Sequence, residues 1–206
     1  MSCFRVFIGL FSALTLAACA SAPQRHSQQL HIPERTQPVR SESVLPPLRV
    51  CPGMQVSNAP VADSNLMLVG YQPYSRVGRV KLARAPVVSC VSSGFGPRSG
   101  GASSFHRGVD LYTRGPAPVY AGGDGVVTAA TSMRGYGNVI FIRHGDGVET
   151  RYAHLSEFAP GLRPGVRVRS GDYIGRTGRT GNATAVHLHY EVLIDGRRQN
   201  PLTIGG

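Results

Sequence analysis

The segment His187-Leu188-His189 places two imidazoles one residue apart at the start of a strand-like run, HLHYEVLI. Side chains alternate between the two faces of a strand, so His187 and His189 share one face. Glu191 lies on that same face, and the apolar residues between them turn toward a core. Residues two apart on a strand are separated by about 7 Å. This spacing lets one imidazole bind a metal ion while the other stands beside the ion's open position.

A second cluster lies upstream in FHRGVDLY, where His106 and Asp110 are four residues apart. On a helix the two would share a face, but Gly108 and the run that follows it favour an extended, bent segment. Short motifs of this kind also arise by chance, so neither cluster is specific when taken alone. Whether the two clusters form one site has to be judged from their order along the chain and from the sequence around them.

Three segments carry that order: GFGPRSGGASSFHRGVDL, then RYAHL, then TGNATAVHLHYEV. Together they resemble the three successive signatures of the lysostaphin and LytM-type zinc metallopeptidases, which cut peptidoglycan peptides. The resemblance runs from about residue 92 to residue 200 and includes the intervening runs GDGVV and RSGDYIGRTG. It is therefore specific in order, spacing and context.

The resemblance implies a role for five residues. His106, Asp110 and His189 correspond to the ligands of one Zn²⁺ ion, and His154 and His187 to the paired catalytic histidines. Two imidazoles and one carboxylate leave a fourth tetrahedral position open, as in catalytic zinc sites. Zinc held in this way polarises a carbonyl and lowers the pKa of a water toward about 7. The two unligated histidines can then move protons and stabilise an oxyanion, and the sequence leaves open which of them is the general base.

Four further residues need a separate interpretation. His144 falls in a predicted hairpin turn, His144-Gly145-Asp146-Gly147, and has no metal role in the resemblance. Tyr152 and Glu191 are strand neighbours of the catalytic histidines, and each either supports the site or is purely structural. Ala185 stands where the family usually has glycine. If that position needs a positive φ, Ala185 strains the loop there.

The elements that position these residues are predicted to be strands. From Cys90 onward, glycine is dense, short β-branched and aromatic runs recur, and no segment sustains a helical period. Residues 90–206 are therefore expected to form a compact, mainly antiparallel β domain, sandwich-like and with a groove. Residues 49–89 hold short apolar runs broken by Gly and Pro. They either pack on the domain as a strand or two, or lie across the active site, with Asn65 for example occupying the metal's open position.

The N-terminus predicts export and lipidation. Residues 1–18 combine Arg5, an apolar run too short to span a bilayer comfortably, and small residues typical of a cleavage zone. An ordinary cleaved signal or a buried helix is the alternative, but Leu-Ala-Ala-Cys resembles a lipobox, which implies acylation of Cys19. Ala20 after it resembles the outer-membrane sorting pattern. Residues 19–48 are rich in Pro, Gln, Ser and Arg, as in a flexible tether. The expected location is the periplasmic side of the outer membrane.

Two of the four cysteines are available for a disulfide. Cys3 leaves with the signal and Cys19 carries lipid, so Cys51 and Cys90 are left in an oxidising compartment. A bridge between them would contribute about 3–4 kcal/mol on the chain-entropy model. The alternative is a pair of free thiols.

The charge balance favours an anionic partner. The chain has 22 Lys and Arg against 11 Asp and Glu, a formal net charge of +11. No basic run is interleaved with aromatic residues, so nucleic acid is not expected as a partner. A cell wall rich in free carboxylates fits this charge, as would other anions.

These features predict a lipid-anchored zinc endopeptidase that hydrolyses peptide cross-links of peptidoglycan during wall remodelling or division. The resemblance and the outer-membrane address imply the D,D cross-link between stem peptides. The alternative is a non-hydrolytic LytM-type protein that activates a separate murein amidase. Such members usually lack some of the ligands, whereas all five positions are filled here. A divisome or amidase partner is compatible with either function.

Overall fold

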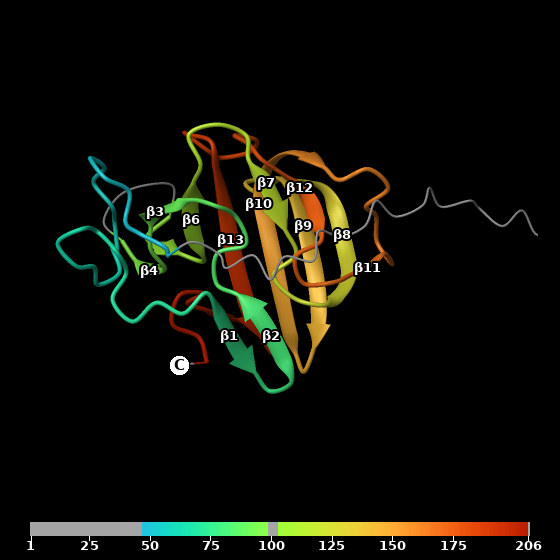
Figure 1. Cartoon of the computed structure of the whole chain (residues 1–206). Helices are drawn as coiled ribbons and strands as arrows, with labels where there is room; N and C mark the ends of the chain where they lie inside the picture. The colour runs from blue at the N-terminus through green and yellow to red at the C-terminus, as the bar shows by residue number, and fades with distance from the viewer. Residues whose placement is uncertain (1–46, 99–102, 206) are drawn as a thin grey trace, which may run out of the picture. The chain divides into compact units, whose positions relative to one another are not determined.

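The computed structural model describes residues 47–98 and 103–205, and within these ranges it consists of strands and turns (Figure 1). The predicted signal peptide, Cys19 and nearly all of the tether lie outside the described residues. Within them no helix is long and apolar enough to cross a membrane. The strands are β1 (Tyr74–Val77), β2 (Val80–Ala83), β3 (Cys90–Ser93), β4 (Gly96–Pro97), β5 (Phe105–His106), β6 (Val109–Tyr112), β7 (Pro118–Tyr120), β8 (Gly125–Met133), β9 (Gly137–Gly145), β10 (Val148–Phe158), β11 (Arg167–Val168), β12 (Tyr173–Thr177), β13 (His187–Ile194) and β14 (Arg197–Gln199).

Ten of these strands form one sheet, and its main path has the order β11-β8-β9-β10-β13-β6-β3. β12 pairs with both β10 and β7, and β14 pairs with β13. The four longest strands, β8, β9, β10 and β13, lie side by side in Figure 1. The paired strands run antiparallel. The predicted mainly β, antiparallel fold class is therefore confirmed.

β13 is the strand on which the site depends, and it is buried on both faces. Leu188 and Tyr190 are fully buried on the core face, as the period-2 pattern predicted. His187 and Glu191, on the opposite face, are buried as well. The strand also lies between β10 and β6 in the sheet, so its two edges are paired as well. The polar face of β13 therefore lies within the protein rather than on an open surface.

Residues 47–89 pack on the β domain. β1 and β2 form a hairpin, and Leu48, Leu82 and Val87 belong to the same hydrophobic core as the main sheet. Cys51 and Cys90 form a disulfide with an S–S distance of 2.07 Å, the bridge that the sequence suggested. Asn65 lies exposed in a turn, where its backbone amide donates to the Asp63 carboxylate.

The first part of this extension runs along β3, the last strand on the main path of the sheet. The Cys51 amide donates to the Val91 carbonyl at 3.0 Å, and the Gly94 amide donates to the Ser57 carbonyl at 2.8 Å. The bridges formed here are parallel. The extension thus covers one edge of the sheet close to the strands that carry the predicted ligands.

Candidate metal centre and active site

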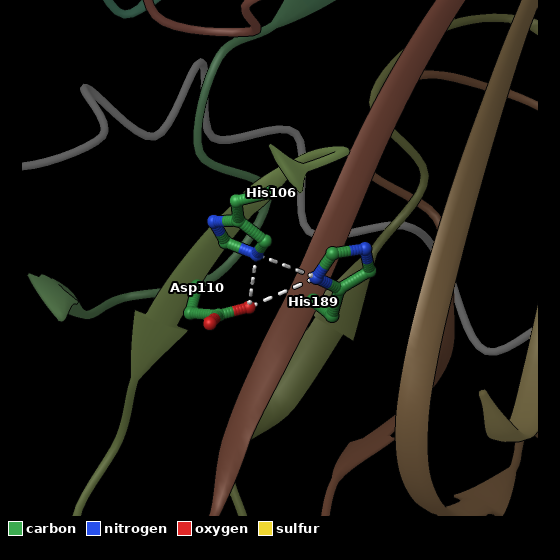
Figure 2. A group of neighbouring side chains, drawn as sticks. All are labelled: His106, Asp110 and His189. Carbon is green, nitrogen blue, oxygen red and sulfur yellow. Dashed lines mark hydrogen bonds and ion pairs between the residues drawn. The ribbon is translucent and has the colours of Figure 1, made fainter. Parts of the chain in front are cut away.

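Cross-strand pairing brings the predicted ligands together. Asp110 on β6 and His189 on β13 are register partners in the antiparallel ladder, so their Cα atoms are about 4.5–5.5 Å apart. His106 ends β5, four residues before Asp110, and its ring points toward both of the other side chains (Figure 2). The three side chains therefore converge from two regions about 80 residues apart in sequence.

The three facing atoms have the spacing of a ligand set. His106 Nε2 lies 3.1 Å from Asp110 Oδ1 and 3.1 Å from His189 Nδ1, and His189 Nδ1 lies 2.9 Å from Asp110 Oδ1 (Figure 2). A tetrahedral zinc ion with bonds of about 2.0–2.1 Å holds its ligand atoms about 3.3 Å apart. Two imidazole nitrogens and one carboxylate oxygen also suit zinc chemically. The donor set therefore fits the metal that the resemblance implies.

The outer nitrogens of His106 and His189, the two candidate ligand histidines, are fixed by acceptors. His106 Nδ1 lies 2.7 Å from the Gly94 carbonyl, and His189 Nε2 lies 3.1 Å from Glu191 Oε1. Because a carbonyl or carboxylate oxygen can only accept, the ring proton in each case lies on the outer nitrogen. The inner nitrogen of each ring then presents its lone pair to the metal position, the arrangement common at metal-binding histidines.

Glu191 is a buried carboxylate with several donors around it. It is 0% exposed and accepts hydrogen bonds from Tyr136 Oη at 2.9 Å and Arg198 Nε at 3.2 Å, besides His189. Burial raises the pKa of Glu191, but the bond from His189 and the charge of Arg198 outweigh burial and leave the pKa below its usual value. The sequence left the role of Glu191 open. Its contacts make it a support of the site that keeps its negative charge.

His154 and His187 lie beside the ligands, with ring centroids 4.8 Å apart. His154 Nδ1 donates to the Thr180 carbonyl and His187 Nδ1 donates to the Ala185 carbonyl, each at 2.8 Å. Nε2 of each ring is therefore the nitrogen left for proton transfer. His187 Nε2 lies 3.5 Å from Asp110 Oδ1. Two imidazoles that can take part in proton transfer are therefore held next to the candidate ligand set.

The backbone of His154 is unusual, with a φ of +62°. β10 shifts register against β9 between Tyr152 and Leu155, so His154 lies in an irregularity of the strand. Its amide donates to the Tyr136 carbonyl at 2.9 Å, which fixes this conformation. A left-handed conformation costs a non-glycine residue about 1–2 kcal/mol, and such strain is concentrated at functional sites. The periodicity of the sequence gave no sign of this feature.

The pKa shifts separate the roles of the buried groups. Burial, and then the neighbouring His187, lower the pKa of His154 to about 4, so its imidazole is neutral near pH 7. Burial also acts to lower the pKa of His189, but bonds to Asp110 and Glu191 outweigh it and raise that pKa to about 9 in the absence of a metal, so a metal ion that binds Nδ1 would displace a proton from it. Burial raises the pKa of Asp110, but its histidine partners outweigh burial and keep the carboxyl ionised. Near pH 7 an ionised Asp110 thus lies close to a neutral His154.

Three other predicted residues lie apart from the chemistry or differ from expectation. His144 is not in the turn but in β9, because the turn consists only of Asp146 and Gly147. It hydrogen-bonds to the Asp124 carbonyl and the Thr150 hydroxyl. Tyr152 is fully buried, and its hydroxyl accepts from the Gly122 amide, which is a structural contact. Ala185 is not among the residues with positive φ, so the strain considered for it does not arise.

Comparison with known proteins places this geometry in a family. The family model described as peptidase family M23 matches residues 104–201. The catalytic domain of the antimicrobial peptidase lysostaphin from Staphylococcus simulans is 32% identical, with a TM-score of 0.50, over 55% of this chain and 89% of that domain. This chain contains a peptidase family M23 domain.

Two further proteins are similar to part of the chain. A zinc-containing peptidase from Vibrio cholerae is 31% identical with a TM-score of 0.55, over 65% of this chain and 40% of that one. The DD-carboxypeptidase/endopeptidase Mpg of Neisseria meningitidis is 45% identical over 100 residues, 48% of this chain. The chain spans only 23% of the length of Mpg. The M23 match contains all five predicted site residues, whereas residues 47–103 precede it.

Proposed function

We propose that this chain is a zinc-dependent endopeptidase that hydrolyses peptide cross-links of peptidoglycan. One observation carries the proposal: His106, Asp110 and His189 converge on one position, and His154 and His187 lie beside it with Nε2 free. Membership of M23 and the zinc-containing peptidase of Vibrio cholerae support zinc as the metal. A single ion would be held by the three converging atoms.

The residues divide the chemistry between binding and proton transfer. When bound, zinc would polarise the scissile carbonyl and make a water a better nucleophile near neutral pH. Asp110 is the single anionic ligand, so an overall charge of +1 is kept at the ion. His154 and His187 are placed to accept the proton of the attacking water, to stabilise the oxyanion and to deliver a proton to the leaving amine. Burial of both rings strengthens these interactions.

The proposed bond is the D,D cross-link between stem peptides. The name of Mpg, a DD-carboxypeptidase/endopeptidase, supports this choice, as does the resemblance of the three motifs to peptidases that cut peptidoglycan. The net charge of +11 favours a substrate rich in carboxylates.

The proposed location is the periplasmic side of the outer membrane, with the chain anchored by lipid on Cys19. The support is the sequence of the first 20 residues and the tether-like composition of residues 19–48. Both segments lie outside the described residues. A divisome protein or a murein amidase is the proposed partner class, because an endopeptidase in this place would act together with other wall enzymes.

Digestion of purified sacculi tests the function. The zinc-loaded chain is compared with His189→Ala and with His144→Ala, which removes a histidine outside the site. Loss of cross-linked dimers on muropeptide separation is expected for the wild type and for His144→Ala but not for His189→Ala. Dimers left intact by the zinc-loaded wild type would exclude the hydrolase and favour the non-hydrolytic activator of an amidase.

A further inference from the structure

The orientation of His106 depends on Ser93, the last residue of β3, and on Gly94, which follows it. His106 Nδ1 donates to the Gly94 carbonyl at 2.7 Å, and the Ser93 hydroxyl lies 3.2 Å from the same nitrogen. The His106 side chain is only 3% exposed, so water has little access to these bonds. The position of Ser93 and Gly94 therefore sets both the plane of the ring and the nitrogen that carries its proton.

These two residues are held in turn by the N-terminal extension. The Gly94 amide donates to the Ser57 carbonyl at 2.8 Å, and the Ser57 and Ser93 hydroxyls are 3.0 Å apart. The carbonyl oxygen of Asn58 lies so close that a Cβ atom added to Gly94 would be 1.8 Å from it. Because this neighbour is backbone, only glycine fits at position 94 without moving the extension.

The extension is itself tied to β3 a few residues upstream. Cys51 is linked to Cys90 by the disulfide, and the Cys51 amide donates to the Val91 carbonyl. Asn58 has a φ of +49°, a conformation that asparagine adopts more readily than most residues. Residues 50–58, called the edge segment below, therefore meet β3 at both ends, through the disulfide and through Ser57 and Asn58.

We infer that the edge segment is a positioning element of the metal site, although it lies outside the region that matches M23. It holds Ser93 and Gly94 so that His106 keeps its proton on Nδ1 and presents Nε2 to the metal. As far as zinc is concerned, the inference rests on the proposed function. The inference implies that a substitution which displaces the edge segment from β3 weakens zinc binding, although no ligand is altered.

Gly94→Ala in the full chain is the direct test, because the added methyl group must displace Asn58. Zinc affinity is measured by competition with a chromophoric chelator, and the proton position on His106 by nitrogen-15 NMR of the metal-free chain. We expect zinc affinity to fall by about 10- to 100-fold, the usual cost of losing a group that orients a ligand. The His106 ring is expected to lose its single Nδ1-protonated form. Gly115→Ala is the matched control, since Gly115 has open space around it and no positive φ.

Ser57→Ala is a milder second variant, in case Gly94→Ala does not fold, and its control is Ser64→Ala at an exposed serine of the same extension. A several-fold loss of zinc affinity is expected for Ser57→Ala alone. The inference is overturned if Ser57→Ala matches Ser64→Ala while Gly94→Ala matches Gly115→Ala or is unfolded. A wild-type chain that binds no zinc would instead refute the proposed function, and the NMR comparison would still decide the role of the edge segment.

Discussion

The two histidine ligands of the proposed metal centre are supported in different ways. His189 lies on a central strand, and its outer nitrogen donates to Glu191, a buried carboxylate bonded to Tyr136 and Arg198. The outer nitrogen of His106 donates to a neutral backbone carbonyl, that of Gly94, near the edge of the sheet.

The two histidine rings are therefore held in place by different kinds of interaction. On the His189 side, charge and the pairing of β13 with two neighbouring strands hold the ligand in place. On the His106 side there is no charge on the accepting group, so order has to come from packing, a disulfide and the fit of a glycine against the edge segment. Electrostatic substitutions should therefore act mainly on the first side, and steric or covalent changes on the second.

Removal of either proposed histidine ligand should have the largest effect on zinc binding. The effect should be the same for His106 and for His189. His106→Ala and His189→Ala are each expected to lose zinc binding altogether, because two remaining protein ligands do not make a stable zinc site. Zinc content after gel filtration, measured by atomic absorption, checks this. His144→Ala is expected to retain one ion per chain. One equivalent of zinc in either ligand variant would contradict the assigned ligand set.

Removal of the disulfide should act on the His106 side. The double variant Cys51→Ser with Cys90→Ser is expected to lower the free energy of unfolding by about 3–4 kcal/mol, measured by urea denaturation. Zinc affinity should fall as well, because the edge segment loses its covalent link to β3. A folded double variant with unchanged zinc affinity would show that hydrogen bonds and packing alone hold the edge segment in place.

Neutralising Glu191 should act on the His189 side. Glu191→Gln keeps the shape of the side chain but removes its charge, and it is expected to lower zinc affinity by about 10- to 100-fold, or about 1.4–2.7 kcal/mol. Chelator competition measures the loss. Glu149→Gln is the matched control, since Glu149 is partly exposed and pairs with Arg151. Equal affinities in the two glutamine variants would mean that the charge of Glu191 does not support the metal centre.

The smallest expected effect concerns the backbone strain at His154. Here a substitution that relieves the strain should raise the free energy of unfolding rather than lower it. Because His154 has a positive φ, His154→Gly is expected to be more stable than His154→Ala by about 1 kcal/mol, although both lose activity. Comparison of the two urea midpoints checks this. A more stable alanine variant would show that the left-handed backbone is not strained.

The convergence of His106, Asp110 and His189 could be anticipated because these residues are carried by short motifs in a fixed order. Strand periodicity placed His187 and His189 on one face, and the dense glycines with short β runs gave the fold class. Motifs and strand periodicity depend only on residues close together in the sequence, so they can be recognised from the sequence alone.

The supports could not be predicted in the same way, because they depend on contacts between distant segments. Nothing near Ser57 or Asn58 indicates that they touch Gly94, which is more than 30 residues away. The charged network at Glu191 needs Tyr136 and Arg198, which only the sheet brings together. The bulge at His154 reflects a register shift that a period-2 pattern does not reveal.

The pairing of the extension with β3 also bears on self-association. An uncovered edge strand offers unpaired amides and carbonyls to the edge of another molecule, which promotes aggregation. Residues 49–57 occupy part of the β3 edge through bonds at Val91 and Gly94. A chain shortened to the region that matches M23 would remove this cover along with β3 itself and leave β6 as a bare edge. The shortest soluble form of this protein should therefore begin before Arg49, well upstream of the sequence that defines its family.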